Sequence, residues 1–576
     1  MKKVYKSLLI LVASFVLLSS ILIFAQLFNT DFGKVKVQSI RIHGENITVA
    51  GYLYEPRKAE NLVDLPAVVL IHGIMNAKET MTALALELAR NGVIALSIDA
   101  LGHGSTIGDI NTEEDPSLGG VTAVRYLKSL SYVNSSNIGL VGHSMGVGAI
   151  RATSVIEGGI KAHIFVGGVS LNNDTLIYGE LNQTSPTNLL VVIGLYDELF
   201  DLQQVEEMLQ PAFGTSEIEI GNLYGSFSNG TARKLISPKT THLFELLSSD
   251  YISESVSWMT NSFGIINGNK TVLYPSRDTF IFIAFFVFAG LFVPISNVGL
   301  EFDFFKNRKQ ENERKEKFTV DTTFSFWSIG LTWSFLHLIL FVPPILLFGM
   351  NPIIIPLYLG FTAIFWLLSL TIVGILIIFF IIKYRYREIP IKQVLLQLGK
   401  KLSNWKGLIL AVNCFLLMVI IDLIIEQIPG MSMKIIVPLF SEFTGIRALM
   451  FLVLIPFMFL YFVVDGFIST GIYEKKLENN ERKRKIWVAV KITGLKLLPL
   501  ILILLLQYFP MLILGSQLFT GFLGFSMQFI IILLPLFLIY SIATLWFYEK
   551  TQSIETGALF NACLFAWTLS TLLPIY

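Results

Sequence analysis

Long apolar runs dominate the C-terminal half of the chain. From residue 278 to residue 576, uncharged apolar stretches alternate with short charged loops. Eight of these stretches are long enough, at 1.5 Å of helix rise per residue, to cross a hydrocarbon core of ~30 Å. Their approximate cores are 279–297, 324–348, 355–380, 407–426, 447–468, 497–516, 525–546 and 556–575. We therefore expect an all-α polytopic membrane domain over residues 278–576.

A further apolar stretch lies at the N-terminus. Residues 7–28 carry no charge and follow three lysines. A cleaved signal peptide is the alternative, but its apolar region is usually only ~7–15 residues long, and Ile23 stands where such a peptide needs a small residue. We interpret residues 1–28 as a signal-anchor transmembrane helix.

Between these regions, residues 29–277 show the shorter patterns of a globular domain. Two alternating stretches within 36–54 predict a β-hairpin. Short β-branched runs then alternate with stretches of helical periodicity. The expected strands are 66–73, 93–99, 137–144, 162–168 and 188–194, and the expected helices are 78–92, 119–130, 145–159 and 243–263. This alternation is typical of the α/β class, with a doubly wound, mostly parallel sheet and helices on both faces.

Composition and charge narrow the function classes. Of the 576 residues, 53% are hydrophobic and only 15% are charged, which is too apolar for a soluble protein. Residues 29–277 hold 25 acidic and 16 basic residues, and such an acidic domain argues against nucleic-acid binding. The two cysteines, Cys414 and Cys563, lie in expected membrane stretches. The globular domain therefore has neither a disulfide framework nor a thiolate metal site.

The basic residues of the loops predict the orientation in the membrane. If nine spans begin with the N-terminus in the cytoplasm, the five cytoplasmic segments hold 25 Lys and Arg residues. The outside loops after residue 278 then hold only Lys434 and Arg447. The positive-inside rule demands this asymmetry, so we expect a multi-pass protein of the cell membrane with residues 29–277 on the extracytoplasmic side.

Asn-x-Ser/Thr sequons give weaker support for this orientation. All six lie in the globular domain, at Asn46, Asn134, Asn173, Asn182, Asn229 and Asn269. They suit an outside, glycosylated surface, although a polar domain also meets the pattern by chance.

One pentapeptide carries candidate chemistry. Gly142-His143-Ser144-Met145-Gly146 is a G-x-S-x-G sequence where an expected strand ends and a helix begins. Small residues two positions before and after the serine permit a sharp turn that exposes its hydroxyl, and the helix N-terminus faces the developing negative charge. A structural glycine-rich turn is the alternative.

A serine hydroxyl needs a base to become nucleophilic, and the scarce histidines can be assigned by elimination. The seven are His43, His72, His103, His143, His163, His242 and His337. After a G-x-S-x-G turn the chain order is serine, acid, histidine. His337 lies in a membrane stretch and His163 precedes any suitable acid, which leaves His242, in the loop before the last helix, as the expected base.

The acid should follow the strand at 188–194. Asp197 is the first carboxylate there, and Glu198 and Asp201 are close rivals. The oxyanion formed by acyl transfer needs two backbone N–H groups, which we expect from Met145 and from Ile74.

Three motifs together resemble the α/β-hydrolase superfamily: His72-Gly73-Ile74, the stretch 99–105 (DALGHGS) and the pentapeptide around Ser144. Its dienelactone-hydrolase-like and serine-aminopeptidase-like branches are the most similar. The resemblance covers about 36–263 and none of the C-terminal apolar stretches, for which we identify no family.

The resemblance implies roles residue by residue. Ser144, Asp197 and His242 fall on the triad positions of the family, and Ile74 and Met145 fall on its oxyanion positions. Positions that are mainly structural in the family are occupied by Asp99, His103 and His143. The stretch between the strands at 162–168 and 188–194, where many relatives insert a lid, is short, so we expect an open site.

These observations predict a membrane-tethered serine hydrolase of carboxylesterase, lipase or peptidase type. Its partners would be the bilayer and a small-molecule, lipid or peptide acyl substrate, with no metal or organic cofactor. One alternative is an acyltransferase that uses the same triad. Another is a transporter or receptor with a hydrolase-like accessory domain, because intramembrane ionisable residues are typical of transporters. The candidates for that role are Asp422, Glu426, Asp465, His337, Lys491 and Lys496.

Overall fold

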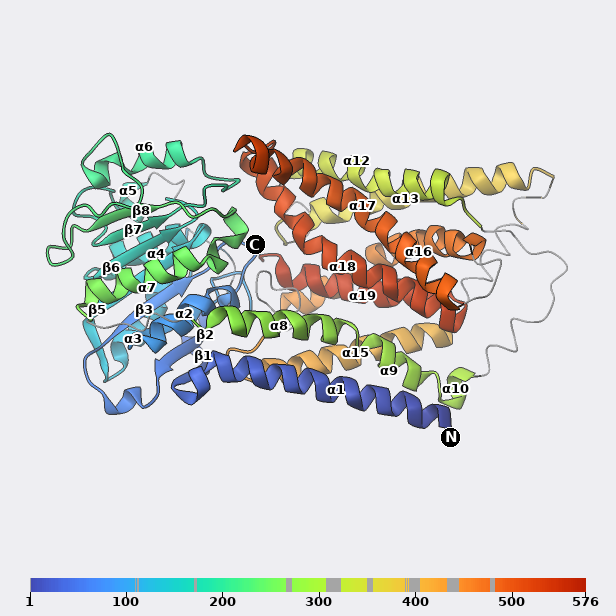
Figure 1. Ribbon diagram of the computed structural model, residues 1–576, viewed down its shortest axis with the longest axis horizontal. Coiled ribbons are helices and arrows are strands. Elements are labelled where there is room, and N and C mark those ends of the chain that lie inside the picture. Colours follow the sequence, from blue (N-terminus) through green and yellow to red (C-terminus); the bar gives the residue numbers. More distant parts are fainter. Residues whose placement is uncertain are drawn as a thin grey trace.

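The computed structural model has two parts, an α/β part and a helical part (Figure 1). The sheet and its helices lie at one end, and the long helices extend away from it at the other. The structure describes residues 2–108, 110, 113–169, 174–265, 272–306, 323–349, 356–388, 390, 392, 404–432, 445–476 and 482–575.

The α/β part is built on one eight-stranded sheet in the order β1-β2-β4-β3-β5-β6-β7-β8. Its strands are β1 (Val35–His43), β2 (Thr48–Pro56), β3 (Leu65–Ile71), β4 (Ile94–Ile98), β5 (Val133–His143), β6 (Ala162–Val166), β7 (Leu189–Val192) and β8 (Arg233–Ile236). The β1–β2 hairpin is antiparallel, β2 is antiparallel to β4, and all other neighbours are parallel. This topology confirms the α/β class with a doubly wound, mostly parallel sheet that was expected from the sequence.

Helices cover both faces of the sheet, because its central strands are apolar on both sides. One core packs the sheet against α3, α4 and α6, and the other packs it against α2 and α7. The helices of this part are α2 (Thr82–Arg90), α3 (Gly120–Ser129), α4 (Met145–Glu157), α5 (Thr175–Tyr178), α6 (Leu202–Phe213) and α7 (Ser249–Phe263). Every residue of β6 and β7 is buried. This explains why their sequences are mostly apolar and do not alternate between apolar and polar residues.

The helical part contains eight helical segments, among the described residues, that are long and apolar enough to cross a membrane. Its helices are α1 (Lys2–Asn29), α8 (Tyr274–Ala289), α9 (Phe292–Gly299), α10 (Asp303–Lys306), α12 (Leu331–Phe348), α13 (Gly360–Arg385), α15 (Trp405–Glu426), α16 (Ile446–Lys476), α17 (Arg482–Leu514), α18 (Gly521–Thr551) and α19 (Ile554–Leu572). The expected stretch at 279–297 is divided between α8 and α9. Pro294 lacks the N–H that would bond back to Gly290, which favours this break.

The stretch expected at 556–575 forms α19, which is not one of the eight apolar candidates. Nearly every residue of α19 is buried, and the helix packs against α15, α16 and α18. It carries polar side chains that bond within the protein: the Asn561 amide donates to the Tyr540 carbonyl oxygen at 3.0 Å and to the Thr544 hydroxyl at 2.9 Å. A helix surrounded by protein does not need the hydropathy of one that faces lipid.

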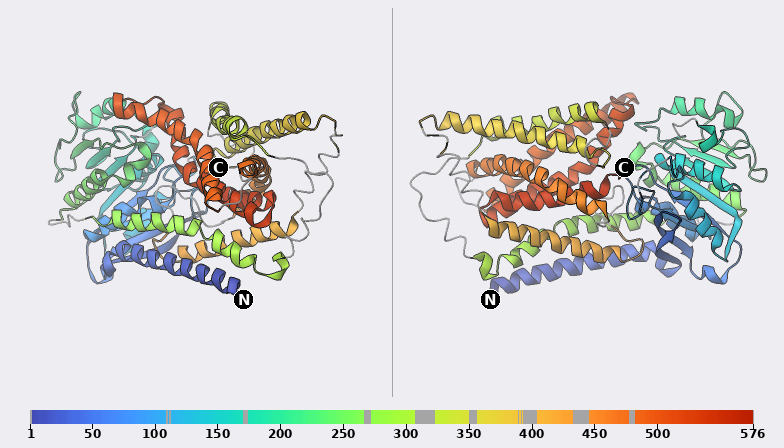
Figure 2. Two further views of the ribbon diagram at one scale, coloured as in Figure 1. Left: turned by 45° about the vertical axis from the view of Figure 1, so that its right-hand side comes forward. Right: turned by 180° about the vertical axis from the view of Figure 1, so that it is seen from behind.

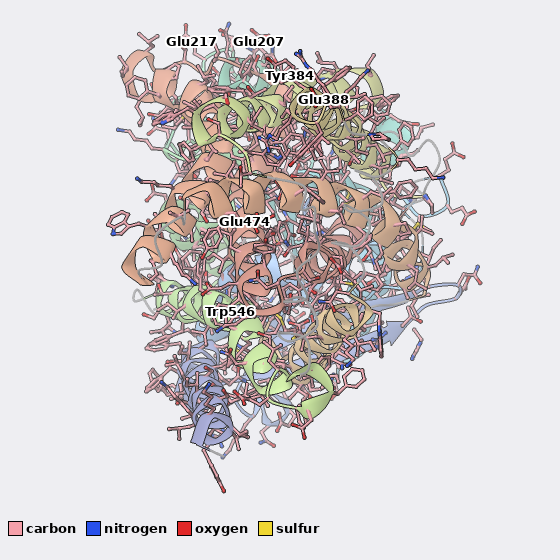
Figure 3. The ribbon with its side chains drawn as sticks, turned by 90° about the vertical axis from the view of Figure 1, so that its right-hand side faces the viewer. Glu207, Glu217, Tyr384, Glu388, Glu474 and Trp546 are labelled. Carbon is pink, nitrogen blue, oxygen red and sulfur yellow. The ribbon has the colours of Figure 1, made fainter. Side chains whose placement is uncertain are left out.

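The two ends of the helical part differ in what they contact. The N-terminus lies at the end remote from the sheet, and the C-terminal segment lies against the α/β part (Figure 2). There the Ile575 N–H donates to the Gly102 carbonyl oxygen at 2.9 Å. Figure 3 looks onto the remote end, where Tyr384 of α13 and Glu474 of α16 are labelled. Of the sequons, Asn173 and Asn269 lie outside the described residues.

Candidate active site

Ser144 occupies a sharp turn between β5 and α4. Its backbone has φ 53° and ψ −115°, a conformation that residues other than glycine rarely adopt. A Cβ atom at Gly142 would collide with the carbonyl oxygen of Gly146, and one at Gly146 would collide with that of Ile71. Both glycines are therefore required for the chain to turn this tightly, as the G-x-S-x-G pattern predicts.

The structure brings Ser144, His242 and Asp197 together in one chain of hydrogen bonds. The Ser144 Oγ lies 3.1 Å from His242 Nε2, and His242 Nδ1 lies 2.7 Å from Asp197 Oδ2. The other carboxylate oxygen of Asp197 accepts the N–H groups of Leu199 at 2.7 Å and Phe200 at 2.9 Å. Asp197 is thus held in place while it orients the imidazole.

The His242 ring is 3% exposed, and its surroundings act on its charge in opposite directions. Burial opposes protonation, but the charge and hydrogen bond of Asp197, together with the charge of Glu198, raise the pKa of His242 above its ordinary value. An imidazole placed in this way accepts a proton from Ser144 more readily than a free histidine does.

The two rival carboxylates do not reach the His242 ring. Asp201 caps the N-terminus of α6, where its side chain accepts the N–H groups of Gln203 at 3.0 Å and Gln204 at 3.2 Å. Glu198 accepts the backbone N–H of His242 at 3.0 Å, and its carboxylate also bonds to two side chains of the helical part. The geometry therefore favours Asp197 among the three.

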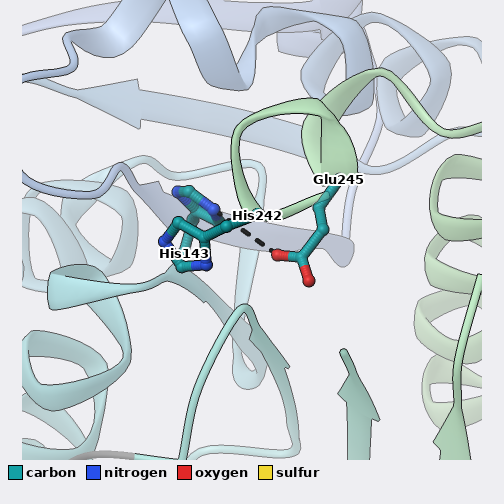
Figure 4. Close-up of side chains that lie close together, drawn as sticks. All are labelled: His143, His242 and Glu245. Carbon is teal, nitrogen blue, oxygen red and sulfur yellow. Dashed lines mark ion pairs between the residues drawn. The ribbon is translucent and has the colours of Figure 1, made fainter. Parts of the chain in front are cut away.

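A second pair of titratable groups, His143 and Glu245, lies beside His242 (Figure 4). His143 Nε2 is 3.6 Å from Glu245 Oε2, and both side chains are buried. Burial lowers the pKa of His143 and raises that of Glu245, so both favour their neutral forms. Ligand atoms of His143, His242 and Glu245 lie within 4.8 Å of one another and could hold a metal ion. However, both ring nitrogens of His242 already bond to Ser144 and Asp197. The cluster is therefore better explained as part of the Ser144 site than as a metal site.

Ile74 lies in the loop after β3 and faces the same pocket as Ser144, while Met145 begins α4. A buried ion pair anchors this loop, because Lys78 Nζ lies 2.7 Å from Asp99 Oδ2. His103 also holds the loop by accepting the Met75 N–H at 3.2 Å. Asp99 and His103 act on loop geometry here. Sequence reasoning missed Lys78, because a lysine at the start of a helix is normally solvent-exposed.

The expectation of an open site is wrong, because the helical part covers Ser144. The pocket around Ser144 has a volume of about 30 Å³ and is lined on one side by Phe525, Gln528 and Ile532 of α18 and by Leu572 of α19. The Phe525 ring packs edge-on against the His242 ring, with centroids 6.0 Å apart. Helices far along the chain thus cover Ser144 in the place where a local lid would lie.

Side chains of the helical part also hold the loop that carries Asp197. The Glu198 carboxylate accepts the Tyr508 hydroxyl and the Gln528 amide, each at 2.7 Å. The Gln517 amide donates to the Tyr196 carbonyl oxygen at 2.6 Å. Sequence reasoning missed these contacts because nothing local marks a glutamine or tyrosine near a membrane helix end as a partner of a distant loop.

Several intramembrane candidates meet in a separate cluster. Asp465 of α16 pairs with Lys496 of α17 at 2.5 Å and accepts the Trp333 indole N–H at 3.1 Å. His337 Nε2 lies 2.7 Å from the Tyr461 hydroxyl. These charges are paired inside the helical part, as buried charges must be.

Comparison with known protein sequences finds a relative that matches part of the chain. No protein-family profile matches the chain. The chain is similar to the uncharacterized protein YcjY of Escherichia coli (strain K12), with 30% identity over 142 residues, which are 24% of this chain and 45% of YcjY. The chain thus spans about half the length of the curated relative it matches.

Solved structures similar to the chain include esterases. The esterase Pf2001 of Pyrococcus furiosus is 17% identical, with 40% of this chain and 94% of that chain covered and a TM-score of 0.31. The α/β hydrolase GrgF from Penicillium sp. sh18 is 14% identical, with 40% and 99% covered and a TM-score of 0.31. Est1E of Butyrivibrio proteoclasticus, bound to ferulic acid, is 20% identical, with 38% and 96% covered and a TM-score of 0.28.

Proposed function

We propose that the protein is a membrane-tethered serine hydrolase that cleaves an ester or amide bond at Ser144. The observation that supports this best is the hydrogen-bonded chain from Ser144 through His242 to Asp197, placed at a strained strand-to-helix turn. Such a constellation is recognised by its geometry and roles, and here the three residues also follow the chain order of this fold.

The geometry supports a two-step acyl transfer. His242 Nε2 takes the proton of Ser144 as the Oγ atom attacks the substrate carbonyl carbon, and it gives that proton to the leaving alcohol or amine. A new bond joins Ser144 Oγ to the acyl group. Water, deprotonated by His242, then attacks this acyl-enzyme and releases the acid. Asp197 holds the imidazole tautomer and stabilises its positive charge.

We further propose that backbone N–H groups of Ile74 and Met145 stabilise the oxyanion. Ile74 lines the pocket of Ser144, and the N–H of Met145 belongs to the first turn of α4, where backbone donors have no partner within the helix. The buried Lys78–Asp99 pair keeps the Ile74 loop in position for this role.

The α/β part lies on the extracytoplasmic side in this proposal. Basic residues support it, since Lys383 and Arg385 end α13 and Lys550 ends α18, at the helix ends remote from the sheet. The positive-inside rule places such helix ends in the cytoplasm.

The test is labelling of the purified full-length protein with a fluorophosphonate, which reacts with activated serines. We expect wild type to form an adduct at Ser144 and Ser144→Ala and His242→Ala to form none. The matched control is Ser154→Ala. Ser154 also lies 3.0 Å from a histidine, His163, but the other nitrogen of His163 bonds to a backbone carbonyl oxygen. Labelling lost in Ser154→Ala but kept in Ser144→Ala would refute the proposal. Product analysis with added alcohols then separates hydrolysis from transfer to another acceptor.

Transport is the second candidate function, and the buried Asp465–Lys496 pair favours it. Paired intramembrane charges are typical of ion and substrate pathways. If the helical part transports, Asp465→Asn together with Lys496→Met abolishes uptake into proteoliposomes while fluorophosphonate labelling persists. If hydrolysis is the function, the same double variant retains turnover.

A further inference from the structure

A second cavity lies inside the helical part, next to the pocket of Ser144. It has a volume of about 90 Å³ and lies among α12, α13, α18 and α19. A single water molecule needs only ~10–15 Å³ of such space, so this cavity is large enough for a group of several atoms. Ile532 and Leu572 line both the cavity and the Ser144 pocket, which makes the two spaces neighbours across these side chains.

The wall of this cavity is hydrocarbon. The apolar side chains that line it include Phe341, Trp366, Leu536 and Phe565. Two of the hydroxyl groups at its edge bond to the backbone: Thr362 Oγ1 donates to the Gly349 carbonyl oxygen at 2.8 Å, and Thr568 Oγ1 donates to the Leu564 carbonyl oxygen at 3.0 Å. A cavity with such a wall does not hold ordered water well and favours an apolar guest.

The Ser144 pocket has the opposite character on its other side. There the lining groups are the Ser144 hydroxyl, the His242 imidazole and the side chain of Asn76. The two neighbouring spaces therefore form a site with a reactive polar end and an apolar end. An acyl group whose carbonyl carbon is in reach of Ser144 would extend its chain past Ile532 and Leu572.

We propose that the cavity among α12, α13, α18 and α19 binds the alkyl chain of a long-chain acyl ester, and that such an ester is the substrate class. This inference rests on the proposed serine-hydrolase function. Ser144 Oγ forms a bond to the acyl carbon, the bond from that carbon to the ester oxygen breaks, and the proton passes through His242 to the departing alcohol. Water then cleaves the acyl-enzyme and releases a fatty acid. The helical part supplies the apolar half of the site, which gives its helices a role beyond anchoring.

The first test is a chain-length series of p-nitrophenyl esters, from acetyl to dodecanoyl, with the full-length protein in detergent. Each methylene that enters the cavity should raise kcat/KM by about 4-fold until the cavity is filled. If kcat/KM is independent of chain length while the acetyl ester is hydrolysed, the proposal is wrong. If no ester is hydrolysed and a short fluorophosphonate does not label Ser144, the serine-hydrolase proposal itself fails.

Two variants test the location of the chain. Ala363→Phe fills the cavity from α13 and should shift the preferred chain to shorter esters. Leu569→Ala enlarges it from α19 and should shift the preference to longer esters. The control Ile375→Phe introduces the same phenylalanine on α13 at a position whose side chain is 50% exposed, and it should leave the profile unchanged.

Short-chain fluorophosphonate labelling of Ser144 reports whether each variant is folded. A labelled variant with an unshifted profile contradicts the assignment of this cavity. If Ala363→Phe is not labelled, the opposite shift expected from Leu569→Ala decides the question alone. Release of fatty acid from phospholipid vesicles then shows whether a bilayer lipid supplies the ester.

Discussion

Three carboxylates within five residues, Asp197, Glu198 and Asp201, occupy different environments, and their substitution should separate catalysis from stability. In Asp197→Asn, the residue no longer stabilises a positive charge on His242 and no longer holds the productive tautomer. The 2.7 Å hydrogen bond between His242 Nδ1 and Asp197 Oδ2 is the contact that this substitution alters. We expect kcat to fall by about 10⁴-fold, as in the corresponding change of a serine-protease triad, with little change in stability.

Glu198→Ala should instead destabilise the protein. The Glu198 carboxylate accepts three donors, two of them from the buried His242 and Gln528 and one from the half-buried Tyr508. At ~1 kcal/mol for each donor left without a partner, the free energy of unfolding should fall by roughly 3 kcal/mol. Glu198→Gln should recover most of this loss, because its amide oxygen can still accept and the Tyr508 hydroxyl can accept from its amide nitrogen.

Asp201→Asn is the matched control, since asparagine caps a helix about as well as aspartate and both quantities should stay near wild type. The assay measures kcat for a short-chain ester and the thermal unfolding midpoint in the same detergent. A 10⁴-fold loss of kcat in Glu198→Gln or Asp201→Asn, with Asp197→Asn active, would refute the assignment of the acid.

Three further changes test other parts of the site. His242 must be neutral to accept a proton and its pKa is raised, so kcat/KM should fall as the pH drops through that pKa. Asp197→Asn should move this acid limb of the pH profile to lower pH. An acid limb that does not move would contradict the pairing of Asp197 with His242. Gly146→Ala should abolish fluorophosphonate labelling, since its Cβ collides with the Ile71 carbonyl oxygen, and wild-type labelling would show that the turn is not constrained. Lys78→Met leaves a buried carboxylate without its cation and should lower the free energy of unfolding by about 3–5 kcal/mol, whereas an unchanged melting temperature would mean that the ion pair contributes little.

Local patterns allowed much of the α/β part to be predicted from sequence. The period of apolar residues distinguishes strands from helices, and the G-x-S-x-G turn depends on the lack of side chains at Gly142 and Gly146. The strand β8 (Arg233–Ile236) was missed because it has only four residues, two of them basic. The acid remained ambiguous in sequence, because distance along the chain does not separate Asp197 from Glu198.

Features that depend on distant parts of the chain could not be predicted. Phe525 and Gln528 cover Ser144 from α18, and no pattern near either residue marks that contact. The apolar stretch at 556–575 was expected to be an ordinary span, and the sequence did not show that α19 is buried among other helices and is less apolar than a lipid-facing span. The buried state of Lys78 follows from its pairing with Asp99, which only the fold brings near.

The most direct test of the central claim is labelling of intact cells with a membrane-impermeant fluorophosphonate, with wild type compared with Ser144→Ala. We predict that wild type is labelled before lysis and that Ser144→Ala is not, because the proposed function places an activated serine on the outer side of the membrane. Labelling only after lysis would contradict the orientation. Absence of labelling under both conditions, with the protein present in the membrane, would contradict the assignment of Ser144 as an activated nucleophile.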